Sequence, residues 1–268
     1  MPLIHRKKHF IHYETLGDPR NPPLLLIMGL ALSSRAWDRL PELMARRFHV
    51  LVFDNRGTGK SARVGVAYRM AELADDAAAV IEACGFSSAH VFGISMGGMI
   101  AQELALRHPD RVRSLALGCT IASWRKSTPP SLKTKLDLLL LNLGFVNPDR
   151  VGRILVSAEW HAQNPAGAID WIKRAERTAL RFATAQVLAI ARHHTLPRLA
   201  HIRAPTLVIT GGADRLVPPV NSEVLARSIP GARLLVVPGA GHCFPLEREE
   251  ETVRALSEHF LASEARAA

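Results

Sequence analysis

Short apolar runs recur along this chain, and each one ends at a residue that favours a turn. Amphipathic segments with a helical spacing of apolar residues lie between them, as at 70–84, 96–107 and 249–262. Near-continuous apolar runs of this length are typical of parallel strands that are buried on both faces. The pattern therefore predicts an α/β fold with a mostly parallel central sheet and helices on both faces. The runs occupy 24–28, 49–53, 89–92, 112–117, 205–209 and 233–237.

One long stretch interrupts this alternation. Residues 121–199 show helical patterns and no convincing strand, and they hold three of the four tryptophans. The simplest arrangement is a helical cap inserted between two strands of the sheet. We therefore expect residues 1–120 and 200–268 to form the core and 121–199 to form the cap. Residues 3–16 are expected to form an antiparallel hairpin arm at the start of the chain.

The chain is strongly basic, with a formal net charge of +10. A basic balance raises nucleic acid, an anionic membrane or an acidic substrate as a partner. However, the cations are spread along the sequence, and no basic stretch is interleaved with aromatic residues as in single-strand binding proteins. No run of 18 apolar residues is present, so we expect no membrane span. The sequence predicts neither a nucleic-acid partner nor a membrane partner.

The cysteines and the amino-terminal residues indicate the cellular compartment in which the protein is expected. Cys84, Cys119 and Cys243 are widely spaced and form no Cys-x-x-Cys pair, so neither a metal site nor a redox pair is predicted. Residues 1–12 lack the apolar core of a signal peptide. Reduced thiols in a cytoplasmic protein are the expectation.

The segment Gly93-Ile94-Ser95-Met96-Gly97 fits the pattern Gly-x-Ser-x-Gly. It follows one predicted strand directly and precedes a predicted helix, which is the context that a nucleophilic serine requires. A tight turn there exposes the hydroxyl, and the flanking glycines leave room for the turn. We therefore predict Ser95 as a nucleophile and the Met96 N–H as a donor to a developing oxyanion.

A serine hydroxyl needs a base, and the base needs an orienting carboxylate. Asp214 follows the apolar run 205–209, and His242 follows the run 233–237. Both side chains are thus expected at the carboxyl ends of parallel strands, on the same side as Ser95. The order serine, acid, histidine is that of one large hydrolase fold. We predict Asp214 as the acid and His242 as the base.

The second oxyanion donor is expected in the loop after an earlier strand. Gly29 and Leu30 occupy the loop after the run 24–28. Glycine permits close approach of the backbone to the substrate, so Gly29 is a candidate for substrate contact. The N–H of Leu30 is the predicted donor.

Together these motifs resemble the α/β-hydrolase superfamily, and the resemblance covers nearly the whole chain outside 121–199. The stretch 54–61, Asp-Asn-Arg-Gly-Thr-Gly-Lys-Ser, is similar to the family's Asp-x-Arg-Gly-x-Gly-x-Ser loop. The family commonly has His-Gly where this chain has Met28-Gly29, and Met-Gly resembles the aclacinomycin methylesterase-like members. The pattern also looks like the enol-lactonases. Serine at position 95 argues against dehalogenase and epoxide hydrolase relatives, which use aspartate there.

The resemblance implies a serine esterase or lactonase that needs neither a cofactor nor a metal. The apolar residues of the expected cap indicate a small, largely apolar ester as the substrate. Carbon–carbon bond hydrolysis, perhydrolysis and thioester cleavage use the same machinery and stay open. A receptor of the same fold that binds a ligand without turnover is a further alternative, and a homodimer is left open. Trp124, Leu139, Trp160 and Trp171, with Phe182 beside them, would either line the substrate pocket or form the core between the cap and the sheet.

Overall fold

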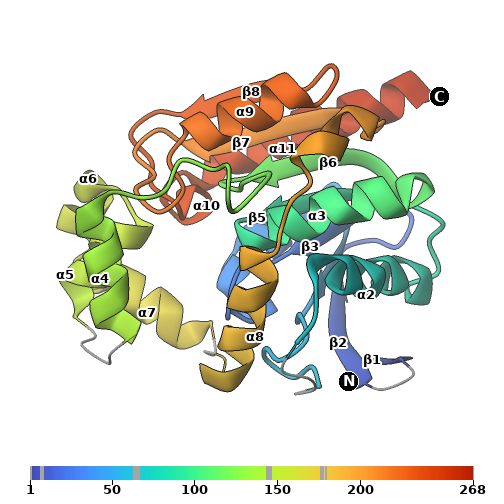
Figure 1. Cartoon of the computed structure of the whole chain (residues 1–268). Helices are drawn as coiled ribbons and strands as arrows, with labels where there is room; N and C mark the ends of the chain where they lie inside the picture. The colour runs from blue at the N-terminus through green and yellow to red at the C-terminus, as the bar shows by residue number, and fades with distance from the viewer. Residues whose placement is uncertain are drawn as a thin grey trace.

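The computed structural model of the chain describes residues 2–6, 9–62, 67–142, 147–175, 178 and 180–267. Within this part of the chain, eight strands form a sheet in the order β1-β2-β4-β3-β5-β6-β7-β8 (Figure 1). The strands β1 and β2 pair antiparallel, as expected for residues 3–16, and β2 pairs antiparallel with β4. The other neighbours pair in parallel. The strands are β1 (Leu3–Arg6), β2 (His9–Leu16), β3 (Pro23–Ile27), β4 (His49–Phe53), β5 (Ala89–Ile94), β6 (Val112–Gly118), β7 (Thr206–Gly211) and β8 (Arg233–Val237).

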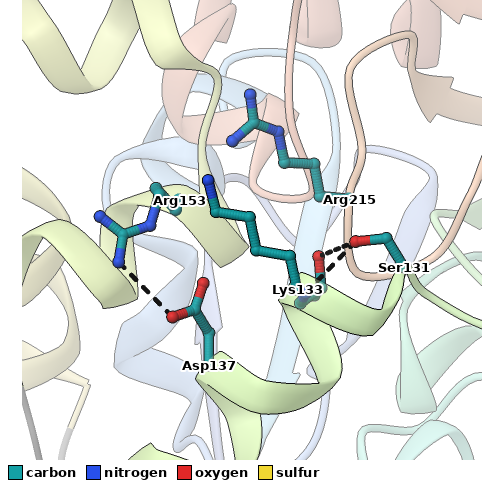
Figure 2. Close-up of a pocket in the computed structure, with 6 residues that line it drawn as sticks. Ser131, Lys133, Asp137, Arg153 and Arg215 are labelled. Carbon is teal, nitrogen blue, oxygen red and sulfur yellow. Dashed lines mark hydrogen bonds and ion pairs between the residues drawn. The ribbon is translucent and has the colours of Figure 1, made fainter.

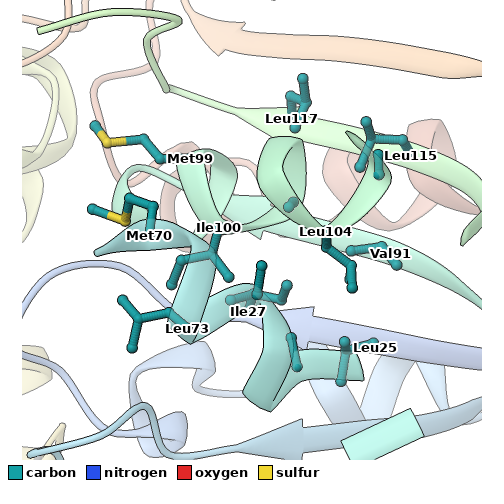
Figure 3. Packing of buried hydrophobic residues seen from close by; sticks show 14 of the residues in the cluster. Leu25, Ile27, Met70, Leu73, Val91, Met99, Ile100, Leu104, Leu115 and Leu117 are labelled. Carbon is teal, nitrogen blue, oxygen red and sulfur yellow. The ribbon is translucent and has the colours of Figure 1, made fainter. Parts of the chain in front are cut away.

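Helices cover both faces of the sheet, which confirms the predicted fold class. Successive side chains of a strand point to opposite faces, and β3 shows this directly. Leu25 and Ile27 pack in one apolar cluster with α2 and α3 (Figure 3). Leu24 and Leu26 pack in a second cluster on the other face, with α1 and α11. The helices that frame the sheet are α1 (Leu40–Met44), α2 (Met70–Ala83), α3 (Met96–Arg107), α9 (Val220–Ser228), α10 (Phe244–Glu247) and α11 (Glu249–Ala267), with the short helices η1 (Ser34–Trp37) and η2 (Pro109–Arg111).

Four of the inner strands are buried at every residue, whereas β8 at the edge is not. All residues of β3, β4, β5 and β7 are buried. In β8 the side chains of Leu234 and Val236 are 38% and 42% exposed. The difference follows from position, because β8 lies at the edge of the sheet and has one strand neighbour.

Between β6 and β7 the described residues form helices and no named strand. The isolated bridge between Ser123 and His194 is the one extended pairing there. Local sequence starts two of the helices, since the side chain of Asn147 caps α5 and that of Ser157 caps α6. In Figure 1, α4 to α7 stand beyond one end of the sheet. The helices are α4 (Leu132–Asn142), α5 (Pro148–Leu155), α6 (Ala158–Gln163), α7 (Gly167–Arg174), α8 (Leu180–Ala191) and η3 (Leu196–His201).

A helix that crosses a bilayer must be long and largely apolar, and this requirement can be applied to the described helices. None of them combines the length and the apolar character that crossing a membrane demands.

Candidate active site

Ser95 lies on the sharp turn between β5 and α3, in a conformation that only a constrained backbone maintains. Its φ is 55° and its ψ is −121°, an unfavourable region for a residue with a side chain. Two hydrogen bonds hold the turn. The Ser95 N–H donates to the Gly118 carbonyl at 2.8 Å, and the Thr120 hydroxyl donates to the Ser95 carbonyl at 2.7 Å. The side chain is half-buried and therefore reachable.

The glycines around Ser95 are required by space. A Cβ on Gly93 would overlap the carbonyl group of Gly97, and a Cβ on Gly97 would overlap the carbonyl oxygen of Ile27. Both neighbours are backbone atoms, one in α3 and one in β3, which cannot move aside without disrupting the helix or the sheet. The Gly-x-Ser-x-Gly pattern is thus explained by close approach of α3 to strands β3 and β5.

Asp214 and His242 form a buried hydrogen-bonded pair. His242 Nδ1 lies 2.8 Å from Asp214 Oδ2, and the two side chains are 7% and 0% exposed. The other carboxylate oxygen accepts the N–H groups of Leu216 and Val217, each at 2.8 Å. A carboxylate can only accept, so the proton resides on Nδ1. In the neutral imidazole with this tautomer, Nε2 is the nitrogen that can accept a proton, as a general base must.

The loops that carry this pair lie directly against one another. The Gly212 N–H donates to the Val237 carbonyl, and the Ala213 N–H donates to the Ala240 carbonyl, both at 2.8 Å. A Cβ on Gly211 would overlap the carbonyl oxygen of Gly241. These small residues therefore let the loops after β7 and β8 meet, and the contact sets Asp214 beside His242.

Sequence reasoning passed over Cys119 as a member of this site. Its sulfur, the Asp214 carboxylate and His242 each offer an atom within 4.8 Å of the others, and all three residues are buried. Burial above all, and then the charge of Asp214, raise the pKa of the Cys119 thiol well above its usual range. The thiol therefore stays neutral beside the carboxylate. Its place directly after β6 was the available signal, because side chains at that end of a parallel strand gather with the loops that follow the neighbouring strands.

The cluster of Cys119, Asp214 and His242 is the one group of His, Cys, Asp or Glu among the described residues that is close enough to ligate a metal ion. The ligand atoms of Asp214 and His242 are already engaged in hydrogen bonds. The Asp214 carboxylate already accepts three hydrogen bonds, and a metal on Nδ1 would displace the His242 proton.

The loop after β3 lies against Ser95. A Cβ on Gly29 would stand 3.2 Å from Ser95 Cβ and 3.8 Å from its Oγ. Neither the Leu30 N–H nor the Met96 N–H donates to an acceptor among the described residues. Two free backbone donors beside a reachable serine hydroxyl suit the stabilisation of negative charge on a substrate oxygen.

Gln186, on helix α8, is a second residue that sequence reasoning missed. Its Oε1 accepts the Ala31 N–H at 2.7 Å, and its Nε2 donates to the Arg56 carbonyl at 3.2 Å. Ala31 itself has a φ of 59°, so the loop after β3 is held in a strained form. The Gln186 side chain is fully buried. No local pattern marks it, because its partners lie more than a hundred residues away in the sequence.

The tryptophans predicted for the substrate pocket lie in different places. Trp171 is buried, and its Nε1 donates to the Ala36 carbonyl at 2.9 Å. This hydrogen bond joins α7 to η1. The ring of Trp160 packs over Gly167, where a Cβ would stand 2.6 Å from it. Trp124 is 53% exposed. These contacts are with protein and solvent, and none of them is with Ser95.

Two further predicted pocket residues complete the set. The buried Phe182 contacts Gly57, where a Cβ would stand 2.8 Å from the Phe182 Cβ. Leu139 lies on α4, but its side chain falls outside the described residues. Among the predicted substrate contacts, Gly29 lies against Ser95.

Known proteins share both the sequence pattern and the fold of this chain. The chain is 32% identical over 282 residues to "Rhodomycin D methylesterase DauP" of Streptomyces sp. (strain C5), covering 93% of this chain and 94% of that protein. It is 33% identical over 254 residues to "Putative carbamate hydrolase RutD" of Azorhizobium caulinodans, covering 91% and 92%. The crystal structure of the enol-lactonase from Burkholderia xenovorans LB400 superposes with a TM-score of 0.84 at 24% identity, covering 97% and 100%.

The family itself is shown by a model described as the alpha/beta hydrolase fold, which matches residues 22–249. The match spans the turn at Ser95 and the loops that carry Asp214 and His242. The resemblance predicted from the sequence is thereby confirmed, and this chain belongs to the alpha/beta hydrolase family.

Proposed function

We propose that this protein hydrolyses small carboxylic esters or lactones through a catalytic triad of Ser95, His242 and Asp214 and an acyl-enzyme intermediate. One observation carries the proposal. The 2.8 Å hydrogen bond from His242 Nδ1 to Asp214 leaves Nε2 as a proton acceptor at the carboxyl end of the sheet, where Ser95 also lies. Relatives that include a methylesterase support ester hydrolysis as the class of reaction.

The proposed reaction follows from the roles of these atoms. The Ser95 Oγ attacks the ester carbonyl carbon, and its proton passes to His242 Nε2. The N–H groups of Leu30 and Met96 stabilise the negative oxygen of the tetrahedral intermediate. When the intermediate collapses, the carbon–oxygen bond to the alcohol breaks and the alcohol takes the proton from Nε2. Water then repeats the sequence on the acyl-enzyme and releases the acid.

We further propose that residues 121–199 act as a cap that shapes the substrate site. Contacts between this segment and the loop after β3 support the assignment. The Ala175 carbonyl accepts both the N–H and the hydroxyl of Ser33, and Gln186 accepts the Ala31 N–H. The loop after β3 carries Leu30, the proposed oxyanion donor, and we call it the oxyanion loop. Because the cap is bonded to this loop, a substrate that fits the cap can also fix the position of the oxyanion donor. A cytoplasmic location completes the proposal and is supported by three free cysteine thiols.

The test is release of p-nitrophenol from a series of esters, acetate to decanoate, by the wild type and by Ser95→Ala. We expect the substitution to lower kcat by about 10⁴-fold or more, since the nucleophile is lost. Ser228→Ala is a matched control, because the Ser228 hydroxyl bonds within helix α9 to the Val224 carbonyl. Equal activity in wild type and Ser95→Ala would contradict the proposal. Tight ligand binding without any turnover would favour the receptor alternative.

Carbamate hydrolysis is a second candidate, because a relative of 33% identity carries that name. The same triad can attack a carbamate carbonyl, so the geometry around Ser95 does not separate the two reactions. The discriminating measurement compares kcat/KM for a p-nitrophenyl ester with that for the matching p-nitrophenyl carbamate. A higher value for the carbamate would favour this second function.

A further inference from the structure

A pocket of about 260 Å³ lies where helices α4 and α5 face the loop after β7. Its lining carries three cations and one carboxylate. Figure 2 shows the amine of Lys133 pointing between the guanidinium groups of Arg153 and Arg215. The lining residues are Ser131, Lys133, Thr134, Asp137, Arg153 and Arg215.

The single carboxylate in the pocket lining does not neutralise the three cations that line it. Asp137 is buried and is shared by two arginines, with Arg150 Nε at 3.3 Å and Arg153 Nη2 at 3.5 Å. Among the described residues, Lys133 and Arg215 form no ion pair or hydrogen bond through their charged groups. The Nε of Arg153 is buried and likewise has no hydrogen-bond partner in that part of the chain. A buried donor without an acceptor costs free energy that a bound anion would recover.

The chain connects this pocket to the loops that carry Asp214 and His242. Arg215 follows Asp214 directly in the chain, and the Asp214 carboxylate bonds His242. The end of α5 is joined to the histidine loop, because the Cys243 N–H donates to the Leu155 carbonyl at 2.8 Å. A Cβ on Gly241 would stand 2.6 Å from the backbone of Val156. The cations therefore lie along the boundary between residues 121–199 and the loops of the acid and the base.

We propose that Lys133, Arg153 and Arg215 bind the carboxylate group of an anionic ester, so that the enzyme prefers half esters of dicarboxylic acids. The inference rests on the proposed ester hydrolysis and replaces the expectation of a largely apolar substrate. Arginine and lysine donors bind carboxylate oxygens through charge-assisted hydrogen bonds. With Asp137 inside the pocket, three cations leave an excess of two positive charges for the ligand.

The test compares two substrates of equal chain length, mono-p-nitrophenyl glutarate and p-nitrophenyl valerate. We expect Lys133→Gln to lower kcat/KM for the glutarate half ester about tenfold and to leave the valerate value within about twofold, as loss of one hydrogen bond to a charged group implies. Lys135→Gln is the matched control, because this exposed lysine lies on the same helix outside the pocket. Raising the salt concentration should reduce the preference for the half ester.

Direct binding separates this inference from the proposed function. Glutarate and inorganic phosphate are titrated calorimetrically into Ser95→Ala with and without Lys133→Gln. Saturable glutarate binding that Lys133→Gln weakens supports the carboxylate site, even when the wild type hydrolyses no ester and the proposed function fails. Ester hydrolysis without a preference for the half ester, or phosphate binding tighter than glutarate binding, would overturn the carboxylate assignment. An equal loss of kcat/KM on both esters would overturn it as well.

Discussion

Replacing Asp214 by asparagine should abolish most of the activity while leaving the fold intact. Asp214 Oδ1 accepts two backbone N–H groups, from Leu216 and Val217, and Oδ2 accepts the proton of His242. The asparagine amide has one acceptor oxygen and one donor nitrogen. The two backbone donors require the oxygen on their side, so the amide NH₂ must face the histidine.

The histidine is then forced into the wrong tautomer. A donor facing Nδ1 requires Nδ1 to be unprotonated, which puts the proton on Nε2, the nitrogen that must accept the proton of Ser95. Loss of the base in this way lowers kcat by about 10⁴-fold, which corresponds to about 5.4 kcal/mol of transition-state stabilisation. Because asparagine is nearly isosteric and keeps both backbone hydrogen bonds, we expect the unfolding free energy to change by less than about 1 kcal/mol.

The assay is kcat on the best p-nitrophenyl ester, together with urea denaturation of each variant. Asp110→Asn is the control, since this exposed acid lies in η2 and tests the effect of losing one negative charge. A folded Asp214→Asn enzyme that keeps more than one tenth of the wild-type kcat would refute the role assigned to Asp214. A similar loss in Asp110→Asn would show that net charge, and not the tautomer, controls the rate.

Two further predictions concern the support of the site and the acid stability. Gln186→Ala should lower kcat about tenfold without unfolding the protein, because the Ala31 N–H loses its acceptor at 2.7 Å and the loop after β3 relaxes. An unchanged kcat in this variant would contradict the supporting role of Gln186. Burial, above all, lowers the pKa of His259 to about 4, although its Nε2 bonds the Leu115 carbonyl. The unfolded imidazole binds a proton near pH 6.5, so the native state should lose stability as the pH falls from about 6.5 towards 4, by up to about 3 kcal/mol. Urea denaturation at pH 7 and pH 5 should show a smaller acid loss in His259→Gln, and an equal loss would refute this assignment.

Much of this protein could be predicted from its sequence because the signals are local. A run such as 24–28 encodes burial on both faces of a strand within its own five residues, and the structure confirms the fold class that follows. The turn at Ser95 is encoded by its own glycines, which the close approach of backbone atoms requires. Asp214 and His242 could be located because each follows a recognisable strand, although their catalytic roles stay predictions. Parallel strands bring their carboxyl ends to one edge, so position along each strand was enough.

Tertiary structure alone decided what depends on contacts between distant segments. The hydrogen bond from Ala31 to Gln186 joins residues that lie 155 positions apart in the sequence. No local sequence pattern near either residue predicts this contact. Trp171 could equally have faced a substrate, and only packing shows that it bonds the Ala36 carbonyl. The charge excess between α4, α5 and the loop of Arg215 arises in the same way, from residues that are scattered in the sequence. Local patterns encode which side chains are buried and where the chain turns, whereas the identity of each partner is set by how the helices pack on the sheet.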